Sequence, residues 1–192
     1  MKIEEADHEV KQILPRKRYE HTLGVVQSAK YLAGIYNGDV KKAELAAMLH
    51  DIAKYFSKDD MISIIKKEPD IPDDLLNYHL SLWHAPVGAA YVRETYGVHN
   101  SEILNAIYYH TTGRSGMTLL EKIVFLADYI EPGRDFPAVA EVRKLAETDL
   151  DTAVAKALEN TIIFLISRHQ QIYPDTISAY NDLIKRVGRN LK

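Results

Sequence analysis

The apolar residues of this chain recur at intervals of three and four positions along almost its whole length, which is the spacing of one face of an α-helix. The alternation of apolar and polar residues that marks a half-buried strand is scarce. Asn37-Gly38 and Pro132-Gly133 interrupt the pattern where helices are expected to end. The pattern predicts an all-α fold, with helices at about 16–36, 39–51, 58–67, 72–78, 84–97, 101–110, 118–130, 137–148 and 149–169, and a last helix after Pro174.

The length of the chain, 192 residues, is enough for one well-filled core and small for two. No internal repeat, no low-complexity tract and no linker rich in Pro, Gly or Ser divides the sequence. We therefore expect a single domain, residues 1–192, folded as one helical bundle.

The absence of cysteine restricts the chemistry that the chain can perform. It excludes disulfides, thiolate zinc sites, iron–sulfur clusters and cysteine nucleophiles. Any metal ion must therefore be held by imidazole and carboxylate groups.

The charge pattern limits the partners that we expect. A formal net charge of -3, with both signs interspersed, argues against a nucleic-acid binder, although a local basic groove for a small anion remains compatible with it. No segment approaches the roughly 18 apolar residues of a membrane span, and the first residues are acidic where a signal peptide would be apolar. We expect no nucleic acid, no membrane and a soluble, cytoplasmic protein.

Several polar residues interrupt the predicted apolar faces: His21, His50-Asp51, His84, His110 and Asp128. Asp128 ends the run Lys122 to Asp128, which is apolar nearly all round, and a buried carboxylate is costly unless it is paired or bound to a cation. A single inward histidine is more often a hydrogen-bonded core residue than a ligand. Because His79 and His169 also pass the spacing test, periodicity alone does not select the ligands.

The adjacent pair His50-Asp51 is a better signal. A carboxylate has two oxygens, so Asp51 can bridge two metal ions while the neighbouring imidazole binds one of them. The alanines at 46 and 47 let other helices approach closely. Neutral imidazole together with carboxylate suits iron, manganese or zinc better than a magnesium site built only of oxygen ligands.

The order of these residues resembles the H…HD…H…H…D pattern of the HD-domain metal-dependent phosphohydrolases. More narrowly, the chain is similar to the YqeK family of bacterial symmetrical diadenosine tetraphosphate hydrolases. The segments that carry the resemblance are Arg18 to Val25, His50 to Lys54, His110 to Arg114, Leu120 to Arg134 and Tyr173 to Thr176. The resemblance extends over most of the chain and implies a single HD-domain helical bundle with a central metal site.

The resemblance also implies a ligand set. His21, His50, Asp51 and Asp128 would hold the principal metal ion, with iron favoured over manganese or zinc. His84 and His110 would either bind a second ion, with Asp51 as the bridge, or contact the phosphate directly. One or two divalent ions are therefore expected, and Asp51, His84 and His110 are the expected catalytic residues, together with Lys54.

Basic side chains near the ligands are candidates for phosphate binding. Lys54 follows Asp51 by three positions, Arg134 follows the helix that carries Asp128, and Arg18 precedes His21 on the same predicted face. The alternative for each is a solvated surface charge.

The remaining substrate-binding candidates each have a structural alternative. Thr111, beside Thr112, can donate a hydroxyl to phosphate or cap a turn. In Tyr173 to Thr176 the start of the last helix can receive an anion or a base, or Asp175 or Thr176 can simply cap that helix. Trp83 can stack on an adenine, although a lone tryptophan is more often a core residue.

The expected activity is symmetrical cleavage of diadenosine tetraphosphate into two ADP by a water molecule activated at the metal. The ligand would be a dinucleoside polyphosphate or a nucleoside diphosphate, and a homodimer through an apolar helix face is plausible. The alternatives are a related HD-domain enzyme that acts on deoxynucleotides or cyclic dinucleotides, an HD-fold di-iron oxygenase, and a nucleotide sensor that does not cleave its ligand.

Overall fold

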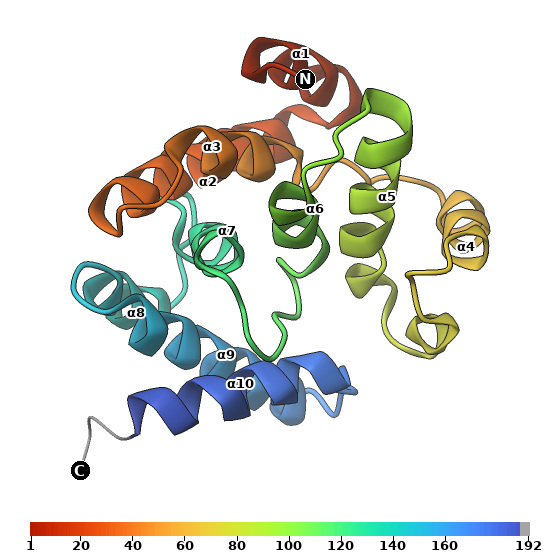
Figure 1. The fold of residues 1–192 in the computed structure, drawn as a ribbon. Coiled ribbons are helices and arrows are strands. Elements are labelled where there is room, and N and C mark those ends of the chain that lie inside the picture. The colour runs from red at the N-terminus through yellow and green to blue at the C-terminus, as the bar shows by residue number, and fades with distance from the viewer. Residues whose placement is uncertain (189–192) are drawn as a thin grey trace.

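The computed structural model describes residues 1–188 and confirms the all-α fold: within this range the chain forms α-helices and two short 3-10 helices, and no strand. Figure 1 shows their arrangement. In chain order the elements are α1 (Ile3–Ile13), α2 (Arg16–Ile35), α3 (Val40–Leu49), α4 (Lys58–Lys67), η1 (Asp73–Asn77), η2 (Leu80–Leu82), α5 (His84–Tyr96), α6 (Ser101–Tyr108), α7 (Leu119–Ile130), α8 (Val139–Ala146), α9 (Leu150–Ser167) and α10 (Pro174–Val187).

Helix α7 lies in the middle of the bundle. It contacts α2, α3, α6, α8 and α9, which surround it in Figure 1. Residues 123–127 of α7 are all buried, as expected for a helix that is apolar nearly all round. Asp128 follows this buried run directly, so its carboxylate lies next to the core, near the C-terminal end of α7.

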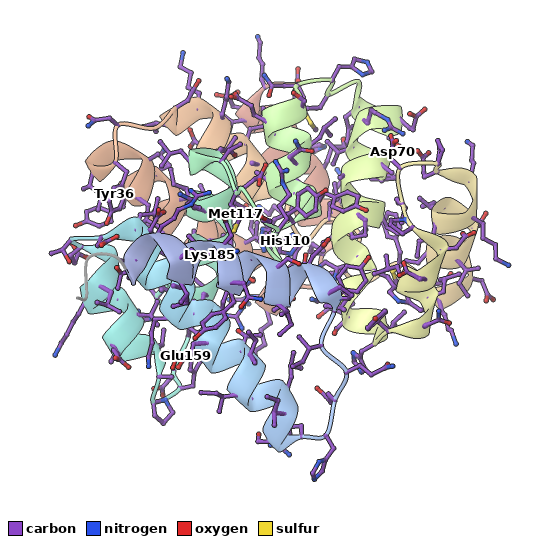
Figure 2. All side chains as sticks on the ribbon, turned by 60° about the horizontal axis from the view of Figure 1, so that its bottom comes forward. Tyr36, Asp70, His110, Met117, Glu159 and Lys185 are labelled. Atoms are coloured by element: carbon purple, nitrogen blue, oxygen red, sulfur yellow. The ribbon has the colours of Figure 1, made fainter. Side chains whose placement is uncertain are left out.

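The C-terminal helices form a separate layer against this centre. Helix α9 packs on α7 and α8, and α10 packs on α9 along one edge of the bundle in Figure 1. Figure 2 shows His110 in the interior of the bundle and Lys185 on the outer helix α10. No helix within residues 1–188 is long and apolar enough to cross a membrane.

Most helix boundaries follow the local signals in the sequence. Asp39, Asn100, Thr118 and Asp149 each accept hydrogen bonds from backbone N–H groups at the start of the helix that follows. Asn37 adopts the left-handed conformation at the end of α2 (φ 54°), so the predicted helix stop is confirmed.

The structure adds one helix that was not predicted, ends two helices earlier than expected, and forms a 3-10 helix, η1, where a helix at 72–78 was expected. Helix α1 was not predicted, because only Ala6 and Val10 are buried in this strongly charged segment. Helices α3 and α6 end earlier than expected, at Leu49 and Tyr108, so that His50 and His110 lie at or beyond the last turn.

The start of α10 also corrects an expectation. Tyr173 is the N-cap residue and Pro174 is the first helical residue, so neither Asp175 nor Thr176, the caps considered as an alternative to ligand binding, caps the helix. Proline suits this position because its missing N–H would have no partner within the helix, and its φ is already helical.

The loop between α6 and α7 offers a matched test of packing. Gly113 and Gly116 both have positive φ (64° and 72°), but a Cβ at Gly113 would lie 3.0 Å from Ala179 Cβ of α10, whereas a Cβ at Gly116 meets nothing within 4 Å. We expect Gly116→Ala to lower the free energy of unfolding by about 1–2 kcal/mol through backbone strain alone. Gly113→Ala should cost about 1–3 kcal/mol more through overpacking.

Urea unfolding of the two variants measures this difference. Equal destabilisation by the two substitutions would show that the contact between this loop and α10 is not tightly packed.

Candidate metal centre

Six polar side chains from five helices or their ends meet inside the bundle. His21 comes from α2, His50 and Asp51 from the end of α3, His84 from the first turn of α5, His110 from the turn after α6, and Asp128 from α7. His50, Asp51, His84 and His110 are buried. Their donor atoms form three overlapping groups that could hold a metal ion: His21, His50 and Asp51; His50, His110 and Asp128; and Asp51, His84 and His110.

The carboxylate of Asp51 divides this cluster into two halves. Its Oδ2 lies 3.3 Å from His50 Nε2 and 3.8 Å from His21 Nε2. Its Oδ1 lies 2.9 Å from His84 Nε2 and 3.8 Å from His110 Nε2. Each oxygen therefore faces its own pair of imidazoles, which is the arrangement expected of a bridging carboxylate.

The outer nitrogens of three imidazoles are held by hydrogen-bond acceptors. His50 Nδ1 donates to Ala47 O (2.6 Å) and His110 Nδ1 donates to Ile107 O (2.7 Å). Both acceptors are carbonyls near a helix end, where the backbone has no partner within the helix. The early ends of α3 and α6 thus make these two contacts available, and each ring turns its Nε2 toward the cluster.

The third imidazole, His21, has a carboxylate as its acceptor. Its Nδ1 lies 3.0 Å from Glu131 Oε1, and an ionised carboxylate can only accept, so Nδ1 carries the proton. The Nε2 lone pair of His21 then points at Asp128 Oδ1, 3.0 Å away. Two electron-rich atoms at this separation repel each other unless a cation lies close to both.

The cluster fits a divalent metal ion. His21 Nε2 and His50 Nε2 are buried and have no hydrogen-bond partner among the described residues. Orphaned nitrogens of this kind are rare in a folded protein, and a cation would satisfy both of them. The donors are imidazole and carboxylate, as the cysteine-free composition requires.

The two carboxylates stay ionised at neutral pH. Burial by itself would raise the pKa of Asp128, but the neighbouring His21 imidazole and the charge of Arg134 together lower it. Burial would likewise raise the pKa of Asp51, but the neighbouring histidines, His50 foremost, hold it well below the usual value. Negative charge is therefore fixed in the interior.

The second half of the cluster is neutral. Burial lowers the pKa of His84 to about 4, and burial also lowers the pKa of His110. At His50, burial again acts to lower the pKa, but the charge of Asp51 outweighs it and raises the pKa. His84 and His110 are thus unprotonated near neutral pH, which is the form that binds a metal ion.

Glu131 is a site residue that the sequence analysis did not select. Its buried carboxylate holds His21 and also accepts from Gly133 N (2.6 Å). A Cβ at Gly24 of α2 would come within 2.6 Å of Glu131 Oε2, so α2 has room for this carboxylate only because residue 24 lacks a side chain. Glu131 lies within the Leu120 to Arg134 segment that carries the family resemblance. Because a proline follows it, its position indicated only the end of a helix and not a role at the site.

Arg143 of α8 holds the turn that carries Glu131. Its guanidinium donates to Ile130 O (2.9 Å), Glu131 O (2.7 Å) and Arg134 O (3.0 Å). These contacts satisfy carbonyls at the end of α7 and fix the path of the chain to Arg134. Helix α8 supplies no residue of the cluster, but through Arg143 it positions Glu131 and Arg134 beside the cluster.

The structure brings all three expected basic residues to the cluster. Arg18 Nη1 donates to Asp51 Oδ2 (3.0 Å), and Arg134 Nη2 donates to Asp128 Oδ1 (2.6 Å). Lys54 Nζ lies 3.3 Å from His84 Nε2 and 3.8 Å from Asp51 Oδ1. Lys54 is in a turn and not on a continued helix, but it reaches the same place.

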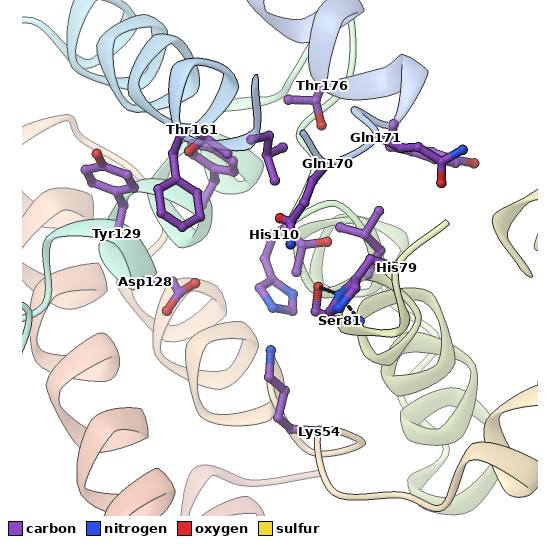
Figure 3. A pocket seen from close by; sticks show the side chains of 16 residues that line it. Lys54, His79, Ser81, His110, Asp128, Tyr129, Thr161, Gln170, Gln171 and Thr176 are labelled. Carbon is purple, nitrogen blue, oxygen red and sulfur yellow. Dashed lines mark hydrogen bonds between the residues drawn. The ribbon is translucent and has the colours of Figure 1, made fainter. Parts of the chain in front are cut away.

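A cavity of about 290 Å³, which we call the inner pocket, opens onto the cluster. Figure 3 shows Lys54 and Thr176 at opposite ends of it, with His110 between them. Thr111 and Tyr173 also line it, as expected, whereas Asp175 does not. Its other walls come from His79, Ser81, Leu82, Phe125, Asp128, Tyr129, Thr161, Phe164, Leu165, Gln170 and Gln171.

The expectation for Trp83 is corrected by the structure. Its indole is buried in a second core cluster with Met61, Ile65 and Leu75, and its Nε1 donates to Leu75 O (3.0 Å). Trp83 is therefore a core residue that anchors the segment before α5, and its ring has no free face for a base. Its sequence position next to His84 gave no sign of this, because adjacent residues at a helix start point in different directions.

Comparison with known proteins identifies close relatives. Residues 18–133 match the HD domain family. The chain is 52% identical, over 96% of its length and 98% of the relative, to the symmetrical bis(5'-nucleosyl)-tetraphosphatase of Bacillus subtilis (strain 168). It is 51% identical to the protein of the same name from Halalkalibacterium halodurans, over 91% and 93% of the two chains, and 43% identical to that of Staphylococcus aureus, over 94% of each.

A solved structure agrees with this assignment. The crystal structure of a predicted HD superfamily hydrolase involved in NAD metabolism from Clostridium acetobutylicum matches with a TM-score of 0.92 and 40% sequence identity. The match covers 97% of this chain and 98% of that chain.

The contact between His21 and Glu131 generates one prediction. Glu131→Gln keeps the size of the side chain but removes the charge that makes His21 a stronger ligand, so we expect the affinity for a divalent metal ion to fall about 10–100-fold. Competition with a chromogenic chelator measures this affinity without an activity assay. Glu20→Gln is a matched control, because Glu20 is an exposed glutamate paired with Arg16 (2.8 Å). Unchanged affinity in the Glu131 variant would rule out its positioning role.

The lowered pKa of His84 generates a second prediction. In the metal-free protein the unfolded chain takes up a proton on this histidine at a pH of about 6.5, whereas the folded protein does so only at about 4. The unfolded state binds more protons in this window, so stability should fall as the pH falls from about 6.5 to about 4. The contribution of this one group is of the order of 3 kcal/mol.

Urea unfolding of the metal-free protein at several pH values tests this sign. His84→Gln should show a shallower loss of stability between pH 6.5 and 4 than the wild type. Identical pH dependence in the two proteins would contradict the assignment.

Proposed function

The chain belongs to the HD-domain family, and on this premise we propose that it is a metal-dependent hydrolase that cleaves diadenosine tetraphosphate symmetrically into two ADP. The observation that carries the proposal is the complete cluster of four imidazoles and two carboxylates with orphaned inward nitrogens. The full-length similarity to three symmetrical bis(5'-nucleosyl)-tetraphosphatases supports the same substrate. We take residues 1–192 as one domain, because the cluster draws ligands from residues 21 to 128 and α8 to α10 pack onto the same core.

In the proposed reaction, the oxygen of a water molecule forms a bond to the β-phosphorus of one half of the substrate. The bond from that phosphorus to the central bridging oxygen breaks, this oxygen leaves with the second ADP, and the attacking water gives up a proton to the solvent. A divalent ion bound by the cluster would supply water activation at neutral pH and would withdraw charge from the phosphoryl oxygens. The leaving ADP is acidic enough that the reaction requires no strong general acid.

Residues of the chain hold the ion and the phosphates. His21, His50, Asp51 and Asp128 are the proposed ligands of the principal ion, and the orphaned nitrogens of His21 and His50 support this choice. His84 and His110 would serve a second ion together with Asp51, or else would contact the phosphate. The group formed by Asp51, His84 and His110 supports the first role.

The basic residues are proposed to bind phosphate oxygens. Arg18 and Arg134 already bridge to the cluster carboxylates, so their guanidinium groups lie beside the expected position of the reacting phosphate. Lys54 lies in a partly dehydrated site. Burial therefore lowers the pKa of its ammonium group, and the charge of Asp51 partly offsets this effect. Cations act most strongly on developing negative charge where water is excluded.

The wall of the inner pocket is proposed to hold one nucleoside. Phe125, Tyr129 and Phe164 supply aromatic surface, and Thr111 and Thr176 supply hydroxyls. Such a mixture of apolar surface and a few polar groups is typical of small-molecule pockets.

Three finer proposals complete this description. Iron is proposed as the natural metal, since imidazole and carboxylate donors suit it and no thiolate competes. A cytoplasmic location is proposed on the basis of the proposed nucleotide substrate. A homodimer is proposed through the exposed apolar end of α9, where Ile163 and Ile166 are each more than half exposed and lie outside the inner pocket.

The proposed function is tested by metal analysis and product analysis on the same preparation. We expect stoichiometric bound metal, ADP as the sole product from diadenosine tetraphosphate, and a loss of at least about a thousandfold in kcat for Asp51→Ala, with loss of the metal. Asp59→Ala, which changes an exposed acid of α4, serves as the control.

The alternatives give different outcomes. Bound metal without cleavage of any nucleotide would favour the sensor or the oxygenase. Full activity in a preparation free of metal would overturn the proposed chemistry.

A further inference from the structure

A second and larger cavity reaches the same cluster from other residues. It has a volume of about 770 Å³ and lies between the first turns of α2 and the turn that follows α7. We call it the basic groove. Its lining consists of Lys17, Arg18, Glu20, His21, Leu23, Gly24, Gln27, Tyr55, Glu131, Pro132, Gly133 and Arg134, and it shares no lining residue with the inner pocket.

The charges of the basic groove favour an anion. Lys17, Arg18 and Arg134 line it, and the last two also contact the carboxylates of the cluster, at Asp51 and Asp128. The two acids of the lining are already engaged: Glu20 pairs with Arg16, and Glu131 holds His21 and Gly133 N. A chain of phosphates that starts at the metal centre would therefore meet guanidinium groups first and an ammonium group farther out.

The outer part of the basic groove offers a surface for a flat ring. Tyr55 is 56% exposed and Leu23 is 41% exposed, and both line this cavity. The Tyr55 hydroxyl makes no hydrogen bond within residues 1–188. Gln27 adds an amide that can donate to and accept from the edge of a base.

The position of the proposed cleavage requires two binding regions. Hydrolysis at the centre of a four-phosphate chain places one nucleoside diphosphate on each side of the reacting phosphorus. The inner pocket, at about 290 Å³, is at the lower limit of the range of roughly 300–1,000 Å³ seen for small-molecule pockets, so it has room for one nucleoside and not two.

We propose that the basic groove binds the second nucleoside diphosphate half of the substrate, with Arg18 and Arg134 on its phosphates and Tyr55 stacked on its base. This inference rests on the proposed function and deepens it. The two identical halves of the substrate then occupy pockets of different chemistry, one lined by aromatic and hydroxyl groups and the other by cations.

The test compares a substrate that has two nucleosides with a ligand that has one. For Tyr55→Ala we expect the KM for diadenosine tetraphosphate to rise about 10-fold, within the range of about 5–150-fold that stacking of one base can supply, with kcat changed less than about threefold. Tyr55→Phe keeps the ring and should stay near the wild type. The proposal assigns the single nucleoside of adenosine 5'-tetraphosphate to the inner pocket, so the inhibition constant of this compound should not change.

The matched control is Tyr31→Ala, which removes another half-exposed tyrosine outside the basic groove. It should leave both constants unchanged. Thermal midpoints of all variants show whether a substitution has acted through folding.

Three results separate the possible failures. An active wild type with an unchanged KM in Tyr55→Ala would overturn the inference and leave the proposed function standing. An equal rise in KM and in the inhibition constant would assign Tyr55 to the first half of the substrate and would also overturn it. A wild type that forms no ADP would instead refute the proposed function itself.

Discussion

Two ionised carboxylates inside a helical bundle are the constraint on which the rest of this structure depends. A charge placed in an interior costs several kcal/mol unless other groups compensate it. Asp51 and Asp128 are compensated by imidazoles, by Arg18 and Arg134, and, in the proposed enzyme, by a metal ion. Helices α2, α3, α5, α6 and α7 have to converge on one point for this to happen, and their alanine-rich contacts and early ends allow it.

The same constraint explains why the supporting groups lie outside the cluster. An imidazole that is free to rotate or to change tautomer binds a metal poorly, so each outward nitrogen needs a fixed acceptor. Two acceptors are carbonyls near the ends of α3 and α6, and the third is the carboxylate of Glu131. Arg143 in turn holds the turn that carries Glu131, so the geometry of His21 depends on a helix that supplies no ligand.

The helices could be predicted from the sequence because they depend on local signals, whereas the six cluster residues were selected by the likeness of their order to the HD-domain pattern. Apolar spacing, capping residues and the pair His50-Asp51 are visible without tertiary information. The sequence did not predict the contact of Glu131 with His21, the place of Tyr55 in the basic groove, or the burial of Trp83. Glu131 and Tyr55 lie beside segments that are distant in sequence. Trp83 packs in the core against Met61 and Leu75 and so does not reach the site. Spacing also could not separate His84 from His79, since both lie near apolar residues and only one is drawn into the cluster.

The division of the chain between α7 and α8 has an evolutionary consequence. The part that matches the HD family ends at residue 133, after the last of the six cluster residues, whereas α9 and α10 supply the far wall of the inner pocket. The six cluster residues are therefore encoded before residue 133, and part of the wall of the inner pocket is encoded after it. A descendant of this protein can exchange its C-terminal helices, and with them the shape of the inner pocket, while inheriting the ligand set and the basic groove unchanged.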